Sequence, residues 1–321
     1  MKVLVAGANG ALGMPLSRLL LARGHQVLGL FRDPASAPAM RALGVEPVVA
    51  DALDREGLLR AVRPFSADAI IHELTALGKP PLWPSRMVMT NRLRAEGTDN
   101  LLAAAAQLGA KRMVTQSMFL GYGFRDHGDH VITEEDPFGI TAGDLTDATI
   151  VAMRLAETKT FTTPEGITLR YGLLYGGDAQ QMRATLAKRG VPVSSGGLLG
   201  WVHHLDAAAA TVAALEHGRP GQAYNIVDDE PASWREVITA MAEGFGAPRP
   251  LGVPRWILQL VTPYVARVAI DTSMRVSNGK AKRELGWQPR FRNYHEGIAA
   301  MVSGRVDDSA VLRMLSHQTH T

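Results

Sequence analysis

Three glycines, Gly7, Gly10 and Gly13, are spaced three residues apart in "GANGALG", between a short apolar run and a segment of helical periodicity. Glycine allows a tight turn and a close approach of phosphate to the backbone, and the free N–H groups of the following helix attract its negative charge. The glycines alone are a weak signal, but the order strand, turn, helix makes it specific. We predict a site for the pyrophosphate of a dinucleotide, formed by Gly7, Asn9, Gly10, Ala11, Leu12 and Gly13.

The turn "FRDP", after the second apolar run, bears on which dinucleotide is bound. In NAD binders an acid about 20 residues beyond the glycines bonds the ribose 2′-hydroxyl. Arg32 stands where a guanidinium would bind a 2′-phosphate, whereas Asp33 could bond the ribose or open a turn before Pro34. We favour NADPH as the cofactor, with NADH as the alternative. Asp51 and Ala52 follow the third run and are expected at the adenine, although Asp51 could equally cap a helix.

The elements that must position these residues alternate along the chain. Short apolar runs are separated by segments of helical periodicity, an order typical of right-handed βαβ units and a parallel sheet. The sequence therefore predicts an α/β fold, a Rossmann-type doubly wound parallel sheet with a smaller C-terminal substrate lobe. The runs are 2–7, 25–32, 46–51, 67–74, 111–117 and 166–176.

The alternation changes after Gly176, where Gly, Ser and Pro become frequent. Residues 205–216 look helical and 223–227 look like a strand that could return to the first sheet. We expect an NAD(P)-binding domain built from 1–176 plus 204–228, and a substrate-binding lobe built from 177–203 plus 229–321.

Composition excludes several classes of function. Of the 321 residues 46% are hydrophobic and 20% charged, which is ordinary for a globular protein, and the net charge is only +3. Cysteine is absent, so disulfides, zinc–thiolate sites and a thiol nucleophile are excluded. No run of about 18 apolar residues or signal segment stands out. We expect a cytoplasmic protein with no metal site and no nucleic-acid or membrane partner.

Several motifs, in their order and spacing, resemble the extended short-chain dehydrogenase/reductase family, in its epimerase/dehydratase-like branch. They are "GANGALG", "NRLRAEGTDNLLAAAAQLGAKRMV", "LRYGLLYG", "WVHHLDAAAA", "AYNIVDDEP" and "RELGWQPRF", and they cover almost the whole chain. "FRDP" looks like the arginine-bearing turn of NADPH-dependent members such as dihydroflavonol reductases. The resemblance implies a small C-terminal lobe that closes over the substrate. It also implies further cofactor contacts from Leu74, Thr75, Asn91, Gln116, Tyr171 and Leu173.

The resemblance fails at the catalytic pair. In the family a serine or threonine orients the carbonyl, a tyrosine transfers the proton, and a lysine four residues later lowers the pKa of that tyrosine. Ser117 matches the serine, but Thr149 and Met153 occupy the other two places. Threonine is too weak an acid near neutral pH, and methionine carries neither charge nor proton. None of the six tyrosines has a lysine four residues later, so the standard mechanism is in doubt.

Typical contributions to the rate indicate that reduction is possible without the tyrosine and the lysine. A general acid contributes about 10²–10⁴ in rate, whereas holding the hydride donor against its acceptor contributes about 7–11 kcal/mol. Ser117 could donate a hydrogen bond to the developing oxyanion. A phenolic hydroxyl of the substrate itself, bonded to the ketone, could absorb the charge.

Methionine and tryptophan in "KPPLWPSRMVM" (79–89) suggest an adaptable apolar pocket, although such residues more often belong to a core. Tyr122 could be a phenolic donor or a packed loop aromatic, and His203 an acid–base group or a packed residue. The candidate substrate contacts are Trp83, Met87, Met118, Phe119, Tyr122, His203 and Trp256.

Three functions follow. The leading hypothesis is an NADPH-dependent ketoreductase for a small hydrophobic molecule, an aromatic polyketide of an antibiotic pathway, with substrate-assisted protonation; a homodimer is compatible with it. The first alternative is a non-catalytic NADP(H)-binding sensor. The second is a nucleotide-sugar epimerase or dehydratase, for which Arg183, Lys188 and Arg189 could bind the diphosphate.

Overall fold

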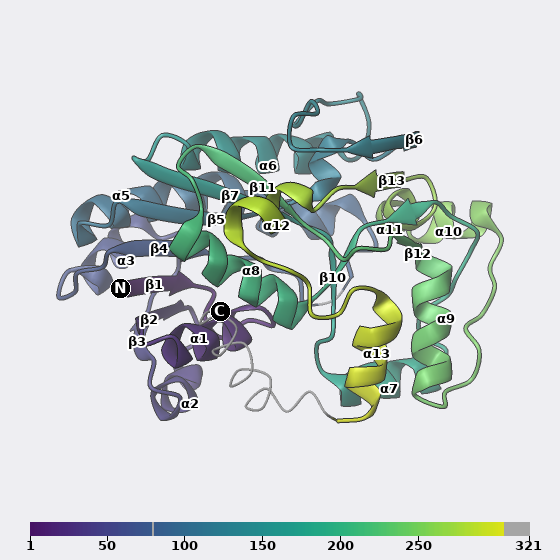
Figure 1. The fold of residues 1–321 in the computed structure, drawn as a ribbon, viewed down its shortest axis with the longest axis horizontal. Helices are drawn as coiled ribbons and strands as arrows, with labels where there is room; N and C mark the ends of the chain where they lie inside the picture. The colour runs from purple at the N-terminus through teal and green to yellow at the C-terminus, as the bar shows by residue number, and fades with distance from the viewer. Residues whose placement is uncertain (79, 305–321) are drawn as a thin grey trace.

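A seven-stranded parallel sheet forms the centre of the molecule in the computed structural model, which describes residues 1–78 and 80–304 (Figure 1). Residue 79 of the predicted substrate loop and residues 305–321 of the expected C-terminal lobe lie outside the described residues. The strand order is β11-β7-β5-β4-β1-β2-β3. This order confirms the Rossmann-type α/β fold, because it runs outward in both directions from β1 and β4.

The apolar runs of the sequence supply these strands. All are short, and β1, β2 and β4 are almost wholly buried and apolar, as expected for strands covered on both faces, whereas the edge strand β3 is partly exposed. The strands are β1 Lys2–Ala6, β2 Gln26–Phe31, β3 Glu46–Val49, β4 Ala69–His72, β5 Arg112–Met118, β7 Glu165–Tyr171 and β11 Gln222–Ile226.

Helices cover both faces of the sheet (Figure 1). On one face α1 (Gly13–Ala22), α8 (His204–His217) and α12 (Gly279–Leu285) pack over one hydrophobic cluster. On the other, α3 (Arg55–Val62), α5 (Thr98–Leu108) and α6 (Asp147–Thr160) lie side by side. The connections add α2 Ala37–Ala42, α4 Val88–Arg92 and the short helices η1 Pro34–Ser36, η2 Pro84–Met87, η3 Leu93–Gly97 and η4 Phe119–Tyr122.

A smaller lobe is assembled from separate parts of the chain. Three two-stranded ladders belong to it: β8 Leu173–Tyr175 with β10 Trp201–His203, β9 Leu198–Leu199 with β12 Ala232–Ser233, and β6 Asp126–Ile132 with β13 Ser273–Val276. Its helices are α7 Ala179–Ala187, α9 Trp234–Gly244, α10 Arg255–Val261, α11 Pro263–Ala269 and α13 Tyr294–Val302. The β6–β13 pairing joins segments that the sequence did not link, so the exact division into two lobes stays a prediction.

The direction of strand order reverses between β1 and β4, and ligands of such sheets bind outside the carboxyl ends of the strands at this point. Gly7 follows β1 there and Glu73 follows β4. Among the helices of residues 1–78 and 80–304, none is both long and apolar enough to cross a membrane.

Candidate active site

The glycine turn after β1 is shaped by close backbone contacts. Gly7 has φ +92°, and a Cβ on it would lie 3.0 Å from the backbone oxygen of Glu73. A Cβ on Gly13 would lie only 2.0 Å from the oxygen of Gly7. α1 begins there with no side-chain cap and no acid in its first turn. The first N–H groups of the helix thus face the turn. Asn9, Gly10 and Ala11 of this turn are exposed, and Leu12 is buried beneath them. This arrangement fits a pyrophosphate.

The turn after β2 separates the roles of its two charged residues. The Asp33 carboxylate accepts a hydrogen bond from the backbone N–H of Ala35 at 3.0 Å and caps the turn. Arg32 is exposed and makes no ion pair within the described part of the chain, so its guanidinium is available to a ligand. Asn9 Nδ2 donates to Ser36 Oγ at 3.0 Å and ties the glycine turn to this one.

The predicted adenine and ribose contacts lie along the carboxyl edge of the sheet. In the turn after β3, Asp51 accepts a hydrogen bond from the Leu53 N–H at 2.8 Å, and the Ala52 carbonyl accepts one from the Asn100 side chain. These two bonds hold Asp51 and Ala52 in place. Of the remaining candidates Leu74, Gln116 and Leu173 are half-buried and Thr75 is exposed.

Glu73, which the sequence did not single out, lies inside the candidate site. The Tyr171 hydroxyl donates to Glu73 Oε1 at 3.0 Å, and Glu73 Oε2 has no hydrogen-bond partner within residues 1–78 and 80–304. Burial raises the pKa of Glu73 to about 8, so the carboxyl is mostly protonated at neutral pH. Tyr171 itself is fully buried and also bonds Thr211 at 2.6 Å.

Unpartnered buried polar atoms gather at this edge and test whether a cofactor fits. They come from β4, β5 and the helix after β4, and each would be costly to leave without a partner. A nicotinamide riboside carries hydroxyl and amide groups, and a substrate beside it carries a carbonyl or an acid, so this set of donors and acceptors fits a cofactor with a substrate next to it. The atoms are His72 Nε2, Glu73 Oε2, Asn91 Oδ1, Arg94 Nη1 and Nη2, and Ser117 Oγ.

Thr149 and Met153 both lie on the buried face of α6. Met153 belongs to an apolar cluster, so it brings no polar group to the site. Thr149 Oγ1 accepts two hydrogen bonds, one from Asn91 Nδ2 and one from the Tyr264 hydroxyl, each at 3.3 Å. Because a hydroxyl has two acceptor positions and one proton, the Thr149 proton remains free to donate.

Tyr264 and Arg94 are the functional candidates that sequence reasoning missed. Tyr264 comes from α11, and no local pattern could have linked it to Thr149, 115 residues away. Arg94 lies on η3, a π-helical segment, three residues after Asn91 of α4, inside the motif "NRLRAEGTDN" on which the family resemblance partly rests. Burial raises the pKa of Tyr264, while Thr149 and the charge of Arg94 act in the opposite direction.

The predicted substrate contacts fall into two groups, because Met87, Met118, Phe119 and Tyr122 share one hydrophobic cluster, whereas Trp83 and Trp256 lie at the surface. Trp83 and Trp256 are 48% and 67% exposed, Met87 and Phe119 are buried in a core cluster, and Met118 is half-buried. The basic residues considered for a diphosphate, Arg183, Lys188 and Arg189, are exposed at α7 and the turn after it.

Tyr122 is held in a buried polar network, whereas His203 makes one side-chain hydrogen bond and its Nε2 has no partner within residues 1–78 and 80–304. The Tyr122 hydroxyl donates to Asn225 Oδ1 at 2.8 Å and accepts from Arg170 Nη1 at 2.7 Å, and burial raises its pKa to about 12. His203 is fully buried, caps α8 by accepting from the Leu205 N–H, and has its pKa lowered to about 3 by burial. His203 therefore stays neutral at physiological pH, as expected for a buried residue that caps a helix.

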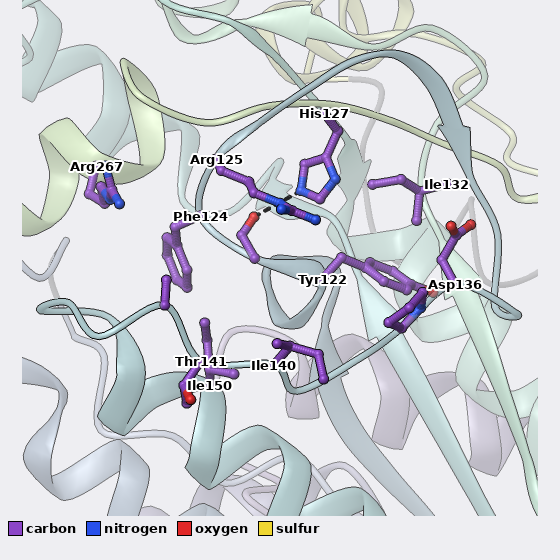
Figure 2. Close-up of a pocket in the computed structure, with 13 residues that line it drawn as sticks. Tyr122, Phe124, Arg125, His127, Ile132, Asp136, Ile140, Thr141, Ile150 and Arg267 are labelled. Atoms are coloured by element: carbon purple, nitrogen blue, oxygen red, sulfur yellow. Dashed lines mark hydrogen bonds between the residues drawn. The ribbon is translucent and has the colours of Figure 1, made fainter.

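A cavity of about 450 Å³ lies beside α6. Figure 2 shows Tyr122, Phe124, Arg125 and His127 facing it from the segment after β5, opposite Ile150 and the loop before α6. Phe124 also contacts the ring of Tyr264, with centroids 5.9 Å apart. One aromatic side chain therefore separates this cavity from the Thr149–Tyr264 pair. Within the described ranges no group of His, Asp or Glu has the arrangement of a metal site.

Comparison with known proteins agrees with this geometry. Residues 3–227 match the model of the NAD dependent epimerase/dehydratase family. The chain is 35% identical to a "3-diazoavenalumate denitrifying reductase" of a Streptomyces species, over 93% of this chain and 99% of the relative. It is 26% identical to a "4-hydroxy-2-methyl-3-oxo-4-farnesyl-3,4-dihydroquinoline-1-oxide ketoreductase" of Stigmatella aurantiaca, over 94% of this chain and 96% of that protein.

A solved structure shows the same fold. UDP-glucose 4-epimerase from Bifidobacterium longum, in complex with NAD+ and UDP, superposes with a TM-score of 0.74 at 20% identity, covering 94% of this chain and 97% of that one. The family match confirms the resemblance that the sequence motifs indicated. The chain belongs to the NAD dependent epimerase/dehydratase family, whose members are nicotinamide-dependent oxidoreductases and epimerases.

Proposed function

We propose that the protein is an NADPH-dependent reductase that transfers hydride to a hydrophobic aromatic substrate without a tyrosine–lysine pair on α6. The observation that carries the proposal is the combination of a complete dinucleotide turn with Thr149 and Met153 on the buried face of α6. The chain keeps the parts that hold an electron donor and lacks the usual proton source.

The cofactor contacts follow from the first three strands. The glycine turn and the start of α1 would hold the pyrophosphate, and exposed Arg32 would pair with the 2′-phosphate. When bound, NADPH supplies the hydride. The partly buried edge formed by Leu74, Gln116 and Leu173 would exclude water from one side of the nicotinamide.

The substrate proposal is a ketone of a polycyclic aromatic polyketide. The Stigmatella relative supports a hydrophobic ketone, because its name specifies a farnesylated oxo compound. Ser117 Oγ, fully buried and unpartnered within residues 1–78 and 80–304, would donate a hydrogen bond to the oxygen as charge develops there. A substrate phenol beside the ketone would neutralise the alkoxide, or Tyr264 would do so through the Thr149 hydroxyl, to which it donates its hydrogen bond.

A second substrate class is favoured by the Streptomyces relative, whose name specifies a diazo compound and a denitrifying reaction. Hydride addition to an aryl diazonium carbon forms a C–H bond, breaks the C–N bond and releases dinitrogen. That step balances without any proton donor. An α6 helix without the tyrosine–lysine pair therefore suits this chemistry as well.

Transfer of deuterium tests the proposal directly. The protein would be incubated with NADPH deuterated on the transferring face and with three acceptors: a polycyclic hydroxyketone, its methyl ether and an aryl diazonium salt. Mass spectrometry would follow deuterium in each product. We expect deuterium on carbon in the hydroxyketone or diazonium product, and loss of ketone turnover when the neighbouring hydroxyl is methylated.

Two outcomes would overturn the proposal. NADPH binding without deuterium transfer to any acceptor would favour the nucleotide sensor. Interconversion of UDP-sugars with retention of the bound cofactor would favour the epimerase. Equal turnover of the hydroxyketone and its methyl ether would argue against substrate-assisted protonation while leaving the reductase intact.

A further inference from the structure

Arg94 is an uncompensated buried cation. Its side chain lies on η3, the residue is only 2% exposed, and neither Nη1 nor Nη2 has a hydrogen-bond partner within residues 1–78 and 80–304. A buried charge is costly unless it is paired, and arginine cannot escape that cost by losing its proton. A ligand that supplies the missing partner would therefore bind strongly.

The surroundings of Arg94 place it in the candidate active site. The titratable groups that interact with it are Tyr264 on α11 and His72 at the end of β4, and both are neutral at physiological pH. Asn91, on the same helix face, donates to Thr149, and Asn91 Oδ1 is also without a partner in the described ranges. The guanidinium thus lies near His72 at the carboxyl end of β4 and near Tyr264 of α11, and Tyr264 in turn bonds Thr149 of α6.

The acids on the neighbouring helices are engaged elsewhere. Glu96, also on η3, pairs with Arg92 at 2.7 Å, and Glu157 on α6 pairs with Arg170 at 2.8 Å. Asp147, in the first turn of α6, accepts two backbone N–H groups. An internal counter-ion for Arg94 from η3 or α6 is thereby excluded.

We infer that Arg94 binds a carboxylate of the substrate, with the Thr149 hydroxyl as a further donor. The inference rests on the proposed reductase and narrows its substrate to an aromatic carboxylic acid. Nη1 and Nη2 form one edge of the planar guanidinium and match the two oxygens of a carboxylate, whereas a single alkoxide oxygen would leave one nitrogen unpaired. Phe124 lines the cavity of about 450 Å³ and contacts the ring of Tyr264, so an aromatic ring in that cavity would lie one side chain away from Tyr264.

Benzoate binding to the NADP+-loaded protein tests the inference without turnover. Calorimetry would compare benzoate with nitrobenzene, a neutral molecule of the same shape, in the wild type, Arg94→Met and Arg94→Lys. The matched control is Arg92→Met, the same change two residues away at an exposed ion pair. We expect wild type and control to prefer benzoate, Arg94→Met to bind it roughly 10- to 100-fold more weakly, and Arg94→Lys to fall between them.

Thermal unfolding of the ligand-free variants separates a binding role from a structural one. If Arg94 serves a ligand, Arg94→Met removes an unpaired buried charge, and its Tm should equal or exceed that of the wild type. A Tm that falls by more than several degrees, with benzoate affinity unchanged in Arg94→Lys, would make Arg94 structural and overturn the inference.

The cofactor is the other possible source of an anion, and a separate arm addresses it. NADP+ affinity should be unchanged in Arg94→Met if the partner is a substrate carboxylate. Loss of NADP+ affinity in this variant, with no benzoate binding by the wild type, would instead assign Arg94 to a cofactor phosphate. Failure of the reductase itself would appear in the deuterium experiment and not here.

Discussion

The Tyr264 hydroxyl, on α11, donates a hydrogen bond to Thr149 Oγ1 on α6 at 3.3 Å. A phenol from α11 therefore reaches the hydroxyl of a residue on α6. Both residues are buried, and Asn91 fixes the threonine hydroxyl from a third direction. The phenol is thus held by packing and by its bond to α6.

Restoring the family tyrosine should destabilise the protein. Thr149→Tyr adds a ring where Tyr264 already fills the space, and such overpacking costs about 1–3 kcal/mol. Tyr264→Ala alone leaves a cavity and should cost about 3–5 kcal/mol. Urea unfolding of the double variant should show a smaller loss in the free energy of unfolding than the sum of the losses in the two single variants. Simple additivity would show that the two rings do not compete for one space.

Ser117→Ala should separate stability from turnover. The hydroxyl is fully buried and has no partner within the described residues, so its removal should change the free energy of unfolding by less than about 0.5 kcal/mol. Turnover of a ketone should fall roughly 10²–10³-fold if this hydroxyl stabilises the oxyanion.

Thr115→Val is the matched control for Ser117, because the two side chains point to the same face of β5. The Thr115 hydroxyl is bonded to Thr160 at 2.7 Å, so its loss should cost about 1 kcal/mol of stability and leave turnover per folded molecule unchanged. Equal turnover in wild type and Ser117→Ala would remove Ser117 from the mechanism.

Arg32→Ala should change cofactor preference. Loss of a charge-assisted contact to the 2′-phosphate weakens NADPH binding by roughly 10- to 100-fold, while NADH, which lacks that phosphate, should bind as before. Quenching of protein fluorescence measures both affinities. Arg41→Ala, an exposed arginine on α2, is the control and should affect neither coenzyme. A parallel loss for NADH would point to damage of the turn.

Because of Glu73, the free energy of unfolding should fall as pH rises from weakly acid to weakly alkaline values. Its pKa is raised from 4.5 to about 8 in the folded protein, so between these values the folded state keeps a proton that the unfolded state has released. The free energy of unfolding should then fall by up to about 1.4 kcal/mol per pH unit from this residue.

Glu73→Gln isolates this contribution, because it removes the titrating group and keeps the shape. Unfolding by guanidinium would be measured at several pH values. As pH rises from 4.5 to about 8, the free energy of unfolding of Glu73→Gln should increase relative to that of the wild type. In Tyr171→Phe the pKa of Glu73 should rise further, because the lost hydrogen bond favours the charged form of Glu73. The free energy of unfolding should then continue to fall with pH to higher values than in the wild type. A constant difference between Glu73→Gln and the wild type would contradict a raised pKa.

Local chemistry made most of the dinucleotide domain predictable. The apolar runs at 2–7 and 67–74 became β1 and β4, and Gly7 and Gly13 occupy positions where a Cβ would collide with backbone. Such features depend on residues within one βαβ unit, so hydrophobic periodicity and glycine placement suffice to find them.

The sequence by itself therefore determined the sheet and the glycine turn after β1, while the roles predicted for Arg32, Thr149 and Met153 stay predictions. Only the tertiary structure decided which groups surround Thr149. The meeting of Tyr264 with Thr149, the bond from Tyr171 to Glu73 and the absence of a partner for Arg94 in the described ranges each depend on segments far apart in the chain. Long-range packing brings these side chains together, and it leaves no periodic or local trace in the sequence.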